Sequence, residues 1–190
     1  MAPNGFRFDT GSLALDLVAT VGWRFGDPVE RLVRPTDLAT WLRSTGLVDS
    51  PPEVGEAAHA ACLALREAIH RTARSASEGR VPTPEDRVLI NQLAALPLRV
   101  PGLDARGQLW WSAIDPVTAA LGTIARDAVT VIGGPDATAI RSCQELRCAM
   151  LFLDRSRGHR RRWCSMAECG NRAKVAAHRQ RARAFATADR

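Results

Sequence analysis

Four of the chain's five cysteines fall in two pairs near its C-terminal end. Four residues separate Cys143 from Cys148, another four separate Cys164 from Cys169, and fifteen lie between the pairs. A structural zinc ion takes four thiolate or imidazole ligands in a closed tetrahedron, and paired cysteines let each turn supply two of them. The spacing therefore predicts one structural Zn²⁺ bound by these four residues. Two disulfides or free thiols are the alternatives.

The predicted zinc is structural rather than catalytic. A catalytic zinc keeps one coordination position open and usually has mixed ligands beside an acid or a base. Four cysteines close the shell, and Glu168 beside Cys169 is more typical of an acid in a first helical turn. The chain also lacks a nucleophile elbow, an HExxH motif, a phosphate loop and a dinucleotide fingerprint. We therefore do not expect an enzyme.

The start of the chain, MAPNGFR, lacks the basic and then apolar pattern of a secretory leader. No window of about 18 residues is apolar and free of charge, so we expect no membrane span. Both observations predict a cytoplasmic protein. Thiols stay reduced in that compartment, which favours metal binding over disulfides.

Charge is distributed unevenly along the chain. Residues 1–140 carry 13 arginines and 16 acids, a balance of −3, whereas residues 141–190 carry 12 arginines, one lysine and 4 acids, a balance of +9. A near-neutral body with a basic tail favours a polyanion partner, most commonly nucleic acid. A disordered basic extension is the alternative.

The segment after Cys169 is rich in alanine and arginine, which are good helix formers, and predicts a helix that starts near Asn171. Cations three and four residues apart form rows along this helix. Their mutual repulsion favours an anionic partner over a solvated helix without one. We expect nucleic acid to be bound by Arg160, Arg161, Arg162, Arg172, Lys174, His178, Arg179, Arg181 and Arg183.

The spacer between the cysteine pairs predicts a hairpin. Residues 150–153 are apolar and typical of a strand, residues 154–159 of a turn, and residues 160–163 lead back to the second pair. This arrangement is typical of a treble-clef-like zinc finger, in which a turn supplies two ligands, a hairpin follows, and a helix starts at the last ligand.

The rest of the chain predicts a mainly α domain of the α+β class. Residues 6–8 alternate like a short strand, and Thr10 or Ser12 could cap a helix that runs to about Val21. Further helices are expected over 35–46, 52–77, 84–96 and 115–133, with a β-hairpin between 97 and 111. The break at Gly133-Gly134-Pro135 predicts a domain over 1–135 and a zinc-finger module over 136–190.

Residues 164–183, CSMAECGNRAKVAAHRQRAR, resemble the signature of the CGNR zinc-finger family, which is named after the motif found here at residues 169–172. Cys143, Cys148 and the run LFLDRSR are similar to the first half of that finger. The segments SLALDLVATVGW and VERLVRPTDLATWLRSTGLV resemble the family's ABATE-type N-terminal domain. Ala19 stands where the family usually has asparagine.

This resemblance spans nearly the whole chain and implies a bacterial, stress-associated transcription regulator with one zinc. Within the motif, we expect Gly170 to give a tight backbone at the helix start and Asn171 to cap or brace the zinc knuckle. Arg172 would brace the hairpin or contact a phosphate.

The leading hypothesis is a regulator that binds duplex DNA through its zinc module, while the N-terminal domain senses a signal or forms a homodimer. An RNA-binding or ribosome-associated module is the first alternative, because charge does not distinguish DNA from RNA. The second is a small-molecule sensor or an enzyme built on the N-terminal domain. A pocket for an effector could use Trp23, Trp41, Trp110 and Trp111, although we interpret these tryptophans as core residues.

Overall fold

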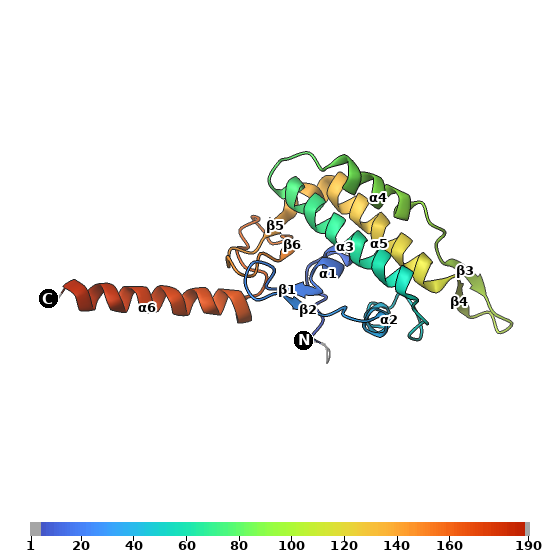
Figure 1. The fold of residues 1–190 in the computed structure, drawn as a ribbon, viewed down its shortest axis with the longest axis horizontal. Helices are drawn as coiled ribbons and strands as arrows, with labels where there is room; N and C mark the ends of the chain where they lie inside the picture. Colours follow the sequence, from blue (N-terminus) through green and yellow to red (C-terminus); the bar gives the residue numbers. More distant parts are fainter. Residues whose placement is uncertain (1–4, 189–190) are drawn as a thin grey trace.

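The computed structural model describes residues 5–188, with side chains up to Arg179. Figure 1 shows a helical body with a hairpin at one end and a long helix that projects from the other. The elements in chain order are α1 (Leu13–Val18), β1 (Val21–Gly22), β2 (Val29–Glu30), α2 (Pro35–Ser44), α3 (Glu56–Ser77), α4 (Pro84–Ala94), β3 (Val100–Leu103), β4 (Leu109–Ser112), α5 (Pro116–Gly133), the 3₁₀ turn η1 (Pro135–Ala139), β5 (Ile140–Ser142), β6 (Leu151–Leu153), the π-helical turn η2 (Met166–Gly170) and α6 (Asn171–Ala188).

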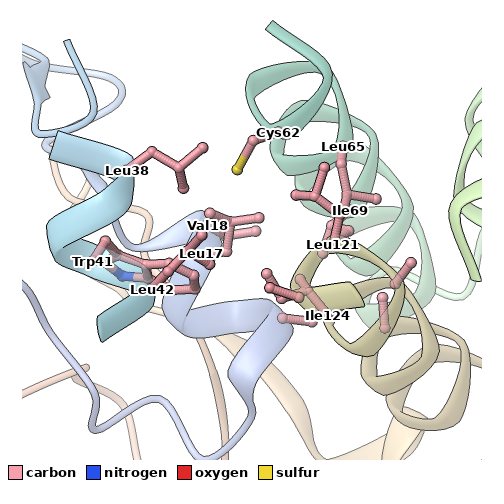
Figure 2. Packing of buried hydrophobic residues seen from close by; sticks show 14 of the residues in the cluster. Leu17, Val18, Leu38, Trp41, Leu42, Cys62, Leu65, Ile69, Leu121 and Ile124 are labelled. Carbon is pink, nitrogen blue, oxygen red and sulfur yellow. The ribbon is translucent and has the colours of Figure 1, made fainter. Parts of the chain in front are cut away.

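The core of the body lies between α1, α2, α3 and α5 (Figure 2). Cys62, Leu65 and Ile69, spaced three and four residues apart, form a fully buried stripe on α3, and Trp41 from α2 is fully buried in the same cluster. Each such side chain stabilises the fold by about 1.5–3 kcal/mol relative to leaving it in water. The expected mainly α fold with small β elements is confirmed.

Polar side chains set the starts of several helices. Ser12 accepts a hydrogen bond from the Leu15 amide, Thr83 from the Asp86 amide and Asp115 from the Val117 amide. Each satisfies a backbone donor that has no partner within its helix. Two boundaries differ from the prediction by more than two residues: the first helix ends at Val18 rather than near 21, and α3 begins at Glu56 rather than 52.

The strands form three antiparallel two-stranded sheets in the part of the chain that the structure describes. β3 and β4 form the hairpin that the sequence predicts between 97 and 111. The expected strand over residues 6–8 is wrong. Phe6 instead packs into the core, while Arg7 points toward the cysteine cluster. β1 and β2 form a further antiparallel pair, with Val21 opposite Glu30, at a place where no strand was predicted.

The zinc-finger region packs directly on the helical body. β5 and β6 pair with Ile140 opposite Leu153, and their buried side chains form one cluster with Leu15, Ala73 and Val131 from three body helices. The predicted return strand over residues 160–163 is wrong, because β6 takes β5 as its partner and leaves that segment as a loop.

Within residues 5–188, no helix combines the length and the apolar character that crossing a membrane requires.

Candidate metal centre

The first cysteine pair lies in the connection between β5 and β6. The Cys143 amide donates to the Met150 carbonyl at 2.8 Å, which extends the hairpin by one bond beyond the strands. The Cys148 amide donates to the Glu145 carbonyl at 2.9 Å and closes a turn. Ala149 follows with a φ of 45°, in the left-handed region. This tight reversal directs Cys143 and Cys148 to the same side of the hairpin end.

The second pair flanks the π-helical turn η2. Ser165 accepts from the Glu168 amide through its side chain and from the Gly170 amide through its carbonyl, so it fixes the turn at both ends. A Cβ on Gly170 would lie 2.7 Å from the Met166 sulfur and 3.2 Å from a Trp163 ring carbon. A side chain at this position would therefore displace Met166 and crowd Trp163 where the turn passes into α6.

The four cysteines are positioned to bind one metal ion. All four are buried, and their sulfur atoms lie within 4.8 Å of one another. The Sγ atoms of Cys148 and Cys164 are 3.7 Å apart, and those of Cys164 and Cys169 are 3.6 Å apart. Four thiolates at about 2.3 Å from a zinc ion lie about 3.8 Å from one another. The donor set and its spacing therefore fit a closed tetrahedral zinc site.

The same distances exclude the disulfide alternative in this structure. A disulfide requires about 2.05 Å between sulfurs, and all five cysteines are free. Cys62, the fifth, lies in the body core on α3 and is not part of the cluster.

The four thiols of the cluster differ in acidity because they hydrogen-bond to one another and are buried. Hydrogen bonds with Cys148 and Cys164 hold the pKa of Cys143 well below its usual range. The bonds to Cys143 raise the pKa of Cys148 and of Cys164 in turn. Burial raises the pKa of Cys169 to about 12. Zinc binds cysteine as the thiolate, so a divalent ion in the cluster stabilises the deprotonated form of all four ligands.

Arg7 contacts the cluster from the N-terminal segment. Its Nη1 lies 4.0 Å from the Cys164 sulfur and donates to Glu168 at 2.9 Å, while its Nη2 donates to Asp9 at 2.7 Å. The hydrogen bond with Asp9 raises the pKa of Arg7 above its usual value. The guanidinium therefore lies between the sulfur of Cys164 and the carboxylate of Glu168, the residue before Cys169. Arg7 was not among the predicted site residues; its signal in the sequence is a single cation between two phenylalanines.

Asp154 organises the loop between the two cysteine pairs. Its fully buried carboxylate accepts from the Ser156 amide at 3.0 Å, the Ser156 hydroxyl at 2.5 Å and the Arg161 amide at 2.8 Å. These bonds, that of the Ser156 hydroxyl first, lower the pKa of Asp154. An ionised carboxylate therefore holds the loop at Ser156 and Arg161, where the sequence had predicted the second half of a hairpin.

Arg161 contributes to the same support. Its guanidinium donates to the backbone carbonyls of Trp163, at 3.0 Å, and of Cys164, and lies 4.4 Å from the centroid of the Phe152 ring. These contacts occupy donors that were predicted to meet nucleic acid.

Arg172, the last residue of the CGNR run, lies 4.3 Å from the centroid of the Trp23 ring. Trp23 follows β1 and has a φ of 53°, a left-handed conformation that is rare for a bulky residue. Arg172, Trp23, Arg7 and Arg31 also line a cavity of about 280 Å³ between the zinc region and the body. Asn171 is exposed, and its backbone amide donates to carbonyls of η2.

The remaining predicted cations lie on two surfaces. Arg160 and Arg162 are exposed on the loop before Cys164, where Arg162 donates to Gln144 at 2.6 Å. Lys174, His178 and Arg179 are exposed on α6. The side chains of two further predicted residues lie outside the described part of the chain; these are Arg181 and Arg183.

Comparison with protein families gives two matches. Residues 11–135 match the model of the ABATE family, whose description is "Putative stress-induced transcription regulator". Residues 139–182 match the model of the CGNR zinc finger. A comparison with curated proteins gives no match.

Proposed function

The chain belongs to the ABATE family and carries a CGNR zinc finger, and from this premise we propose that it regulates transcription by binding duplex DNA through α6. In this proposal residues 136–190 form the DNA-binding module and residues 1–135 the regulatory domain. One structural zinc holds the start of α6, and the exposed cations of the helix and of the preceding loop contact DNA.

The observation that carries the proposal is the charge and placement of α6. No acidic residue occurs between Asn171 and Ala188 in the sequence, and Lys174, His178 and Arg179 are exposed. Figure 1 shows that the helix projects away from the body, which leaves its length accessible. A cationic helix of this kind can enter a major groove or run along phosphates.

The contacts of each cation divide the predicted residues into two roles. Arg161 and Arg172 are engaged with Phe152 and Trp23 and support the zinc module. The exposed cations would mostly neutralise phosphates and so position the module, while two or three would read base edges. Affinity should therefore be dominated by the release of counterions.

The salt dependence of DNA binding tests this proposal. Fluorescence anisotropy with a labelled duplex should show affinity falling steeply as salt rises. Replacing Lys174 or Arg179 by glutamine should weaken binding and reduce the slope of log K against log salt by about one each. Arg43→Gln, at an exposed position on α2, is the matched control and should change neither.

A flat salt response, or no duplex binding at low salt, would overturn the proposal. Competition with single-stranded RNA decides between the two nucleic acids, since displacement by RNA at lower concentration than duplex DNA would favour the RNA-binding alternative. That alternative would draw on stacking aromatics, and Trp163 near the basic surface is half-buried with Arg162 over its ring.

The cavity beside Trp23 favours a second candidate function, sensing of a small molecule. Its volume of about 280 Å³ is near the lower end for small-molecule sites, and an aromatic ring and several guanidinium groups line it. A thermal-shift screen of small anions against the zinc-loaded chain should then give a stabilising ligand whose effect Arg31→Gln removes. A product assay with that ligand separates a sensor from an enzyme.

A further inference from the structure

The loop between β6 and η2 is strongly basic. Residues 155–162 read RSRGHRRR, with five arginines, no lysine and no acid. Figure 1 shows this loop at the end of the body from which α6 projects. We call residues 155–160 the arginine loop. Its charge and its place beside α6 put it on the surface that would face a polyanion.

Hydrogen bonds hold the arginine loop in one tight turn. The His159 ring donates from Nδ1 to the Asp154 carbonyl at 2.7 Å, and the His159 amide donates to the Ser156 carbonyl at 3.1 Å. Gly158 and His159 have φ values of 101° and 50°, so the chain reverses within two residues. Because the turn is already ordered in the free protein, binding through it loses little conformational entropy.

Two arginines of this loop have unused hydrogen-bond donors. Arg157 and Arg160 are exposed, and within residues 5–179 the guanidinium of neither makes an ion pair or a hydrogen bond. Arg155, by contrast, pairs with Asp136 at 2.9 Å. Each free guanidinium presents five N–H donors in a planar arrangement. The loop therefore carries two cations that are available to an external acceptor.

The size of the loop suits the minor groove of DNA. That groove is about 6 Å wide and admits extended side chains, whereas the major groove, about 12 Å wide, admits a helix such as α6. A narrow minor groove concentrates negative potential and attracts arginine, whose guanidinium is more weakly hydrated than the ammonium of lysine. All the cations of residues 155–162 other than His159 are arginines.

The loop also lies close enough to α6 to contact the neighbouring groove of the same duplex. Neighbouring grooves are separated by about half of a 34 Å helical turn, about 17 Å. The chain from Gly158 to Cys164 spans at most about 20 Å. Its end is fixed to the start of α6: the Arg162 guanidinium lies 5.2 Å from the Trp163 ring centroid, and a Cβ on Gly170 would lie 3.2 Å from that ring.

We propose that the arginine loop places Arg157 and Arg160 in the minor groove beside the major groove that holds α6, and that it favours A·T base pairs there. This inference rests on the binding of duplex DNA through α6. In the minor groove A·T pairs present acceptors alone, whereas a G·C pair adds the 2-amino donor of guanine. Guanidinium donors therefore match A·T pairs and are opposed by the guanine amine.

Inosine substitution tests the proposal without knowledge of the target sequence. Hypoxanthine lacks the 2-amino group, so an I·C pair resembles G·C in the major groove and A·T in the minor groove. Fluorescence anisotropy of the full zinc-loaded chain compares a labelled G·C-rich duplex with its inosine-substituted form at one salt concentration. The wild type should bind the inosine duplex at least about fivefold more tightly.

The double variant Arg157→Gln/Arg160→Gln should bind both duplexes more weakly and with equal affinity. Both side chains are exposed, so the variant should fold, and its zinc content and circular dichroism report that it has. Lys174→Gln on α6 is the matched control, which should weaken binding to both duplexes and keep the preference for inosine.

The outcomes separate this proposal from DNA binding itself. Equal affinity of the wild type for the two duplexes would overturn the minor-groove contact and leave binding through α6 standing. A preference for inosine that survives in the double variant would also overturn it, because the arginine loop would then not be its source. No binding of either duplex at low salt would instead overturn the DNA-binding proposal.

Discussion

The guanidinium of Arg172 lies 4.3 Å from the centroid of the Trp23 ring, so the arginine of the CGNR motif contacts the ABATE domain rather than standing free on α6. Trp23 holds a left-handed backbone conformation, which costs about 1–3 kcal/mol and persists where the surroundings enforce it. The contact joins the first turn of α6 to the loop after β1. The orientation of the basic helix therefore depends on the body as well as on the metal.

A double-mutant cycle measures this contact. Trp23→Leu and Arg172→Met remove the ring and the charge in turn, and the coupling free energy of unfolding should be about 0.5–2 kcal/mol, as expected for a cation–π pair that is partly shielded from water. Denaturant unfolding of the four proteins gives the value. A coupling indistinguishable from zero would show that the two side chains are merely adjacent.

Loss of one ligand should remove the metal. Cys164→Ser should reduce bound zinc from one ion per chain to a substoichiometric amount and unfold the zinc-finger region, because a segment with so small a core depends on the metal for its fold. Metal content by atomic absorption and amide hydrogen exchange report the two effects. Cys62→Ala is the matched control, since Cys62 lies in the body core and burial raises the pKa of its thiol to about 12. Equal zinc loss in both variants would contradict the assignment of ligands.

Arg7 should tune the zinc site without binding the metal. Arg7→Met leaves Glu168 without its ion-pair partner and removes the cation beside the Cys164 sulfur. Residues that support metal ligands in this way typically change affinity by 10–100-fold. Competition with a chromophoric chelator should show a weaker zinc complex for this variant. Arg43→Met, on the exposed surface of α2, should bind zinc as the wild type does.

Stability should fall in mild acid because of His70. Burial, and next the charge of Arg24, lower the pKa of His70 to about 4, against an ordinary value of 6.5. A depressed histidine pKa gives stability that is complete above about pH 6.5 and is lost as pH falls toward 4. The free energy of unfolding should drop by about 2 kcal/mol between pH 7 and pH 5 on this account.

His70→Gln isolates this contribution from the protonation of the zinc ligands. With zinc in excess, the variant should lose about 2 kcal/mol less than the wild type over the same pH range, measured by denaturant titration. Parallel pH profiles for the two proteins would rule out the role of His70.

The cluster of four cysteines was predictable because ligand spacing is a local property of the chain. Two cysteines four residues apart can both face one ion from a single turn, whatever the rest of the fold does. The helices were predictable for a similar reason, because cap residues such as Ser12 and Asp115 accept hydrogen bonds from amides in the first turn of the helix that they start. The buried face of α3 was indicated by the spacing of Cys62, Leu65 and Ile69 alone.

Contacts between distant segments were not predictable. The alternation over residues 6–8 indicated a strand, but it arises because Phe6 packs into the core while Arg7 reaches the cysteines. Trp110 and Trp111 were interpreted as core residues and are nearly half exposed, with Arg99 lying 5.5 Å from the centroid of the Trp111 ring. Single-sequence patterns carry no information about such partners.

The central claim is that zinc holds a basic helix in position to bind duplex DNA. Its most direct test is selection of bound fragments from random duplex DNA with the zinc-loaded chain, repeated with Cys164→Ser. The wild type should enrich a common sequence, and the variant should enrich none. Equal enrichment by both proteins, or no binding of any duplex by the wild type at low salt, would contradict it.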